Sequence, residues 1–150
     1  MLDQNTAAQL KTLLERLEGP IELVATLDAS DKSAKIKELV EEIAALSDLV
    51  TARFDGTNKR APSFGVAKAG EQPRVFFAGL PMGHEFTSLI LALLQTSGYA
   101  PKVSNEALES IKGLGIKSDF DVFVSLSCHN CPDVVQALSL IAIYNPGTTA

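Results

Sequence analysis

Apolar residues recur along the chain with two periods, about 3.6 residues and about 2 residues, which are the periods of helices and strands. In the helical segments, leucine and isoleucine fall on one face and charged residues on the other, most clearly at 31–45. In the strand segments, short apolar runs are bounded by glycine, proline or small polar residues. The elements predicted for the first part of the chain are, in order, helix 5–17, strand 21–26, helix 31–45, strands 49–54, 63–67 and 74–78, and a helix from 83 to 98.

The same order of elements begins again after residue 98. The apolar pattern there predicts a helix at 104–111, a strand at 119–126 and a helix at 133–143. A shift of 99 positions places strand on strand and helix on helix without gaps, and it places Ala29 on Cys128. Similar apolar patterns can match by chance, so the repeat is a hypothesis. It predicts two related units, residues 1–98 and residues 99–150, of which the second is incomplete.

Composition and charge narrow the classes of function. With 150 residues, 46% hydrophobic and 21% charged, the chain can form one ordinary domain or two small ones with a buried core. Its net charge of −5 provides no basic surface for nucleic acid. The N-terminus lacks the features of a secretory signal, and the longest dense apolar stretch, 89–94, is too short to cross a bilayer. We therefore expect a cytoplasmic protein that binds neither nucleic acid nor membrane.

The two cysteines of the chain, Cys128 and Cys131, lie in the sequence Cys-His-Asn-Cys-Pro, between a predicted strand and a predicted helix. The partial positive charge at a helix N-terminus favours a thiolate over a thiol. Because structural disulfides are rare in the cytosol, this arrangement indicates a thioredoxin-like redox dithiol. We expect Cys128 to attack a partner's disulfide and Cys131 to resolve the product, while His129 and Asn130 tune thiolate stability.

Two other interpretations of the cysteine pair remain open. A structural zinc site needs about four ligands, and beside the cysteines the chain offers only His84 and His129. His129 lies inside the tight Cys-x-x-Cys loop, where it is poorly placed to bind the same ion. In the third interpretation the cysteines are inert small apolar residues at a helix start. We expect a redox site without a bound metal, and metal analysis of the purified protein tests the zinc interpretation.

Glu85 follows His84 at the start of the helix predicted from residue 83. An acidic residue in the first turn of a helix complements the helix dipole, which is a purely structural role. In the functional interpretation, Glu85 faces the dithiol across the two units and moves protons or shifts the pKa of a thiol. Both interpretations remain open from the residues alone.

Pro62 precedes the strand predicted at 63–67. A proline before a strand is usually a simple turn or strand entry. In a thioredoxin-like unit, however, the same place holds a cis-proline, so the Ala61–Pro62 peptide bond is a candidate for the cis form.

Three segments of the chain resemble one known family. They are Gly19-Pro-Ile-Glu-Leu-Val-Ala-Thr-Leu-Asp28, Gly83-His-Glu-Phe-Thr-Ser-Leu89 and Ser125-Leu-Ser-Cys-His-Asn-Cys-Pro-Asp-Val-Val-Gln-Ala-Leu138. From Met1 to about Pro146, the chain is similar to the N-terminal domain of the F subunit of alkyl hydroperoxide reductase. The resemblance implies an α/β protein of tandem thioredoxin-like folds, the first without cysteines and the second, incomplete here, with the dithiol.

The resemblance also implies a place in an electron-transfer chain. In the family, electrons pass from NADH through FAD to a dithiol in a flavoprotein reductase portion, then to the N-terminal Cys-x-x-Cys, and finally to a peroxiredoxin subunit that destroys hydroperoxides. Cys128 and Cys131 match the N-terminal dithiol, and Glu85 matches an acidic residue that the family places near it. The family proteins are homodimers. The implied activity is that of a disulfide oxidoreductase within an NADH-dependent alkyl hydroperoxide reductase.

The chain departs from the family in two respects. It contains no Gly-rich dinucleotide fingerprint, so we expect neither FAD nor NADH to bind to this chain. It also stops before the remaining strands and the last helix of the second fold. A truncated second unit would have a bare strand edge, which predicts lower stability or self-association. The alternative function is therefore a non-catalytic thioredoxin-like interaction module.

Overall fold

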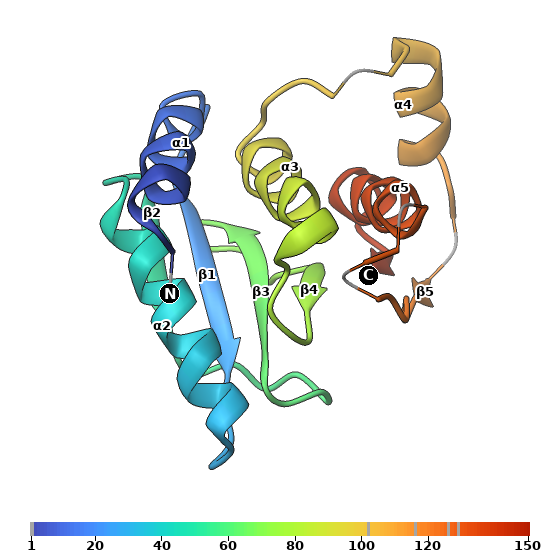
Figure 1. The fold of residues 1–150 in the computed structure, drawn as a ribbon. Helices are drawn as coiled ribbons and strands as arrows, with labels where there is room; N and C mark the ends of the chain where they lie inside the picture. Colours follow the sequence, from blue (N-terminus) through green and yellow to red (C-terminus); the bar gives the residue numbers. More distant parts are fainter. Residues whose placement is uncertain (1, 102, 116, 126, 129) are drawn as a thin grey trace.

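The computed structural model describes residues 2–101, 103–115, 117–125, 127–128 and 130–150 (Figure 1). Up to residue 144 its elements follow the order that the apolar pattern predicts, and a strand at 148–149 follows that was not predicted. The elements are α1 (Gln4–Leu14), β1 (Ile21–Thr26), α2 (Asp31–Ala45), β2 (Val50–Arg53), β3 (Ser63–Lys68), β4 (Val75–Phe77), the 3-10 helix η1 (Gly83–Glu85), α3 (Phe86–Thr96), α4 (Asn105–Lys112), β5 (Ser118–Asp119), α5 (Cys131–Tyr144) and β6 (Thr148–Thr149). The helix predicted from residue 83 therefore begins as a tighter 3-10 turn. None of the described helices is long and apolar enough to span a membrane.

Four strands of the first part form a mixed sheet in the order β2-β1-β3-β4. β1 runs parallel to β2, with Ile21 opposite Val50, and antiparallel to β3, with Leu23 opposite Val66. β4 continues the sheet antiparallel to β3. Helix α2 packs against β1 and β2, and α3 packs against β3. The central strand β1 is therefore paired on both sides and covered by helix.

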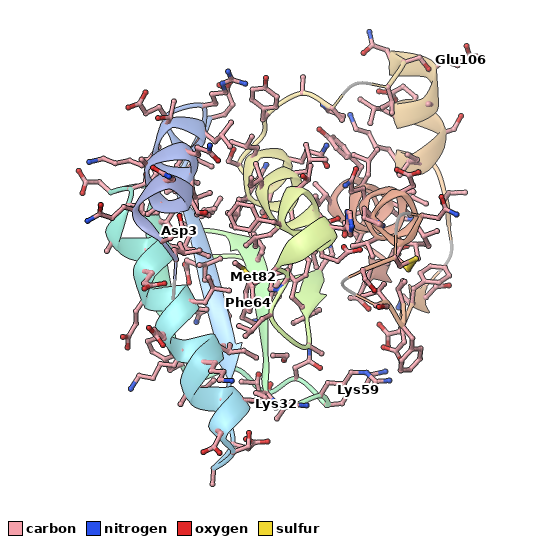
Figure 2. The ribbon with its side chains drawn as sticks, in the orientation of Figure 1. Asp3, Lys32, Lys59, Phe64, Met82 and Glu106 are labelled. Atoms are coloured by element: carbon pink, nitrogen blue, oxygen red, sulfur yellow. A yellow bond between two sulfur atoms is a disulfide. The ribbon has the colours of Figure 1, made fainter. Side chains whose placement is uncertain are left out.

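The core of this sheet consists of side chains that the helical and strand periods select. On α2, the apolar side chains that are buried are Ile36, Leu39, Val40 and Ile43. Phe64 of β3, labelled in Figure 2, is 0% exposed. Burial of one such side chain stabilises the fold by about 1.5–3 kcal/mol. The first part of the chain therefore contains a core sufficient to hold its sheet and helices together.

The remaining elements lie beside the first sheet. Helix α5 packs against α3, and α4 contacts α5 (Figure 1). β6 runs parallel to β5, with Ser118 opposite Thr148. The last residue, Ala150, donates its N–H to the carbonyl of Arg74 at 2.8 Å and accepts from the N–H of Phe76 at 2.7 Å. Backbone hydrogen bonds therefore connect β4, through the C-terminal residues, to β5.

The prediction of a strand at 119–126 was wrong for most of that range. Among the described residues, only Ser118 and Asp119 form a strand there. A strand requires a hydrogen-bonded neighbour, and the last described backbone bond from this segment to a neighbouring strand joins the N–H of Phe120 to the carbonyl of Thr149 at 2.9 Å. Phe123, further along, is 82% exposed. The apolar run has the composition of a strand, but beyond Phe120 the described residues offer it no partner strand.

The order of elements supports the internal repeat. α4, β5, α5 and β6 follow one another as α1, β1, α2 and β2 do, and both second strands pair in parallel with the first. α2 ends at Ala45 and α5 at Tyr144, which are 99 residues apart, the offset found in the sequence. The Ala61–Pro62 bond is cis, as in the thioredoxin-like interpretation of Pro62. The division at residue 98 stays a prediction.

Candidate redox site

Cys128 and Cys131 form a disulfide at the N-terminus of α5, drawn in yellow in Figure 2. Their Cα atoms are 5.5 Å apart, within the usual range for bonded cysteines. Cys131 is the first residue of α5, with Pro132 in the first turn, where a missing N–H costs no hydrogen bond. Both cysteines are partly exposed. A disulfide-bearing partner can therefore approach the pair from solvent.

The local backbone is arranged to stabilise negative charge on the Cys128 sulfur. The N–H of Cys131 donates to Cys128 Sγ at 3.3 Å. The side chain of Asn130, at the N-cap position, makes no capping hydrogen bond. The amides of a first helical turn lack partners within the helix and attract anions. On reduction, these groups favour the Cys128 thiolate; His129 lies outside the described residues.

Glu85 is buried at the end of η1, with 3% of its surface exposed. Among the described residues, neither carboxylate oxygen has a hydrogen-bond partner, although Glu85 immediately precedes α3. The structural interpretation, in which Glu85 complements the dipole of α3, is therefore not supported by a capping hydrogen bond. A buried carboxylate without a donor costs free energy, so this residue is a candidate for function.

Glu85 lines a cavity of about 700 Å³ between the first sheet and α5. Phe77 and Leu80 line it on the side of the first sheet, and Val135 and Leu138 of α5 line it on the other. The described lining residues do not include either cysteine. Glu85 therefore faces α5, the helix that carries the dithiol. It shares the cavity with the second and third turns of α5 and not with the N-terminal turn, where the cysteines lie.

The residues that the structure describes do not fit a dinucleotide or a metal. Gly113 and Gly115 provide a Gly-x-Gly, but Gly113 ends α4 instead of opening a helix after a strand, as a phosphate-binding loop requires. The described parts of the chain hold no group of three or more His, Cys, Asp or Glu side chains suited to a metal ion. The chemistry that this chain itself supplies is that of the two sulfurs and of the acidic and amide groups around α5.

An ion pair that the sequence does not predict joins the two parts of the chain. Arg60 donates from Nη2 to Asp121 Oδ2 at 2.9 Å and from Nε to Oδ1 at 3.3 Å. Lys59, labelled in Figure 2, lies 4.0 Å from the same carboxylate, and the Arg60 guanidinium lies 5.4 Å from the centre of the Phe123 ring. Hydrogen bonding with Arg60 lowers the pKa of Asp121, and the same contact raises the pKa of Arg60. These contacts join residues 61 positions apart, and no pattern in a single sequence signals them.

Comparison with known proteins gives closely similar sequences. The F subunit of alkyl hydroperoxide reductase in Pseudomonas putida is 53% identical over 146 residues, which cover 97% of this chain and 28% of the relative. The corresponding protein of Escherichia coli strain K12 is 53% identical over 147 residues, with the same two coverages of 97% and 28%. No protein-family model matches the chain. The chain therefore spans a little over a quarter of the length of these curated relatives.

A solved structure from a protein of the same name has the same fold. The crystal structure of the NTD_N/C domain of alkylhydroperoxide reductase AhpF from Enterococcus faecalis superposes with a TM-score of 0.88 at 29% identity, and the match covers 100% of this chain and 78% of that one. The tandem thioredoxin-like fold, with its Cys128–Cys131 pair at a helix N-terminus, is thus the fold of a redox domain. Over nearly its whole length, the chain is thus similar to the N-terminal domain of AhpF, the F subunit of alkyl hydroperoxide reductase.

Proposed function

We propose that the chain is a thiol–disulfide oxidoreductase that passes electrons from a flavoprotein reductase portion to a peroxiredoxin, which in turn reduces alkyl hydroperoxides. The observation that carries the proposal is the partly exposed Cys128–Cys131 pair at the N-terminus of α5, in a chain that matches its AhpF relatives over 97% of its length. The reductase portion supplies its electrons through a dithiol of its own, as the family resemblance implies. The family resemblance implies that this portion carries FAD and uses NADH.

Each cycle moves two electrons in two exchange steps. The Cys128 thiolate attacks one sulfur of the partner's disulfide, so that an interprotein S–S bond forms, the partner's S–S bond breaks, and its other sulfur leaves as a thiolate. Cys131 then loses its proton and attacks the Cys128 sulfur. The interprotein bond breaks, and the second partner sulfur leaves as a thiolate. The partner is reduced to a dithiol, and the chain is oxidised to the Cys128–Cys131 disulfide.

Within this proposal, the groups around the sulfurs have distinct roles. The N–H of Cys131, 3.3 Å from Cys128 Sγ, stabilises the attacking thiolate. Glu85 accepts the proton that Cys131 loses; its burial and its two unpartnered oxygens, on a cavity wall that faces α5, support this role. His129 and Asn130 tune the reduction potential, because they stand between the two sulfurs in the sequence.

Trapping the interprotein disulfide tests the proposed function. In the Cys131→Ser variant the resolving thiol is missing, so reaction with an oxidised peroxiredoxin should stop at a mixed disulfide through Cys128. Cys128→Ser is the matched control and should give no adduct. Mass spectrometry after acid quenching and alkylation identifies the product. If Cys128 is alkylated readily but forms no adduct, the proposal fails and the interaction module becomes the better account.

A further inference from the structure

Arg74, just before β4 in the cysteine-free part of the chain, binds the far end of the dithiol helix. Its Nε donates to the carbonyl of Ala142 at 2.8 Å, and its Nη2 donates to the carbonyl of Ile143 at 2.7 Å. Both carbonyls are in the last turn of α5, where no intrahelical donor remains. The N–H of Asn145 takes the preceding carbonyl, that of Ile141, at 2.8 Å. Arg74 therefore satisfies two carbonyls that the helix itself leaves without donors.

Packing against α3, β4 and η1 also holds α5 against the first part of the chain. The buried apolar cluster that bridges them contains Val75, Ala92 and Ala142, and the partly buried Phe77 and Ile143 pack against it. A side-chain hydrogen bond from Gln136 Nε2 to Ser88 Oγ, at 3.2 Å, joins α5 to α3. Gln136 and Ala142 are six residues apart, or about 9 Å along a helix. Two fixed points at that separation set both the position and the rotation of α5.

The influence of Arg74 on the dithiol is through position and not through charge. From Tyr144 back to Cys131 the helix measures about 20 Å, whereas charges in solution are screened over about 8 Å at physiological ionic strength. The thiolate at the N-terminus is therefore insulated from the guanidinium at the C-terminus. Its stability depends on local groups, including the Cys131 N–H.

We propose that Arg74 is a positioning residue: it fixes α5 against the cysteine-free part and thereby sets the direction in which the Cys128–Cys131 pair faces a protein partner. The part of this proposal that concerns the partner rests on the proposed function. The part that concerns α5 stands on the hydrogen bonds alone. Arg74→Met tests both, because it keeps most of the apolar stem and removes the two donors.

The test compares Arg74→Met with wild type and with Arg53→Met. Arg53 is the matched control. It lies on β2 and forms an ion pair with Glu22 of β1, away from α5. We expect Arg74→Met to accelerate amide hydrogen exchange in α5 about tenfold and to slow the reduction of an oxidised peroxiredoxin by a similar factor. The reduction potential against glutathione, and the rate with a small aromatic disulfide, should not change. Arg74→Lys, which can restore one hydrogen bond, should recover part of both effects.

Each outcome has one interpretation. Unchanged hydrogen exchange in Arg74→Met overturns the proposal, whatever the peroxiredoxin assay gives. Faster exchange with an unchanged peroxiredoxin rate shows that the position of α5 does not govern the reaction, which also overturns it. A shifted potential, or equal slowing in Arg53→Met, would mean that the substitution damages the fold in general, which overturns the positioning role as well. A wild-type chain that does not reduce peroxiredoxin refutes the proposed function, while hydrogen exchange still decides the role of Arg74 in holding α5.

Discussion

At the scale of single residues, two carboxylates that line the cavity beside α5, Asp121 and Glu85, lie in opposite environments. Asp121 is on the surface and accepts two hydrogen bonds from Arg60, which lower its pKa. Glu85 is buried, and among the described residues its oxygens have no donor. The first arrangement favours the charged form and ties the segment before the cysteines to the loop at Arg60. The second arrangement, a buried carboxylate without a donor, lowers the stability of the fold. Such destabilising residues are common at functional sites.

The pH dependence of stability tests the Asp121 contact. Because the pKa of Asp121 in the folded chain lies below its ordinary value of 3.8, the contact stabilises the fold fully above about pH 4 and is lost as the pH falls through the folded value. We expect Asp121→Asn to lower the urea midpoint at pH 7 but to leave it equal to wild type at an acid pH low enough to protonate Asp121 in the folded chain. An equal deficit at both pH values would contradict this origin, as would no deficit at pH 7.

Replacement of Glu85 tests two effects of its buried carboxylate separately: the effect on the free energy of unfolding and the effect on the rate of disulfide exchange. Glu85→Gln keeps the shape and removes the charge, so the free energy of unfolding at pH 7 should rise by about 1 kcal/mol. If Glu85 accepts the proton of Cys131, the rate of disulfide exchange should fall several-fold in the same variant. Glu106→Gln, on the exposed face of α4, is the control and should change neither quantity. Loss of stability in Glu85→Gln would mean that the carboxylate has a stabilising partner.

At the scale of elements, helices formed as predicted while one strand did not. α2 needs only its own backbone bonds, its Ser30 cap and one apolar face, and all of these are encoded locally. The segment from Phe120 to Ser125 has a strand composition, but a strand also needs a neighbour from elsewhere in the chain. Beyond Phe120 the described residues provide no such neighbour, so apolar side chains remain exposed, among them Phe123.

The exposed apolar segment should affect association more than stability. Phe123→Lys removes a side chain that is 82% exposed, so the free energy of unfolding should change by less than about 0.5 kcal/mol. Self-association, measured by sedimentation, should fall, because an exposed apolar patch favours contact between copies. Phe64→Ala is the matched core variant and should cost about 3–5 kcal/mol. A large loss of stability in Phe123→Lys would show that this side chain is packed in solution.

At the scale of the whole molecule, the sequence predicted what is local or repeated and missed what joins distant segments. The sheet and helices of the first part, the helix after the cysteines and the dithiol itself followed from period, turn residues and spacing. The Arg60–Asp121 and Arg74–α5 contacts did not, because arginine at those positions is an ordinary surface residue until the chain is folded. The distribution of buried apolar residues explains why the first part was predicted better than its contacts with α5. The large core lies within residues 10–94, and the buried cluster that includes a residue of α5 is small.

The central claim, that the Cys128–Cys131 pair transfers electrons to a peroxiredoxin, is tested most directly by counting thiols. The reduced chain is mixed with a stoichiometric amount of oxidised peroxiredoxin, quenched with acid, alkylated and analysed by mass spectrometry. We predict that this chain loses two alkylatable thiols, that the peroxiredoxin gains two, and that the new disulfide maps to Cys128 and Cys131. If both cysteines of the reduced chain remain alkylatable and the peroxiredoxin stays oxidised, the account is contradicted.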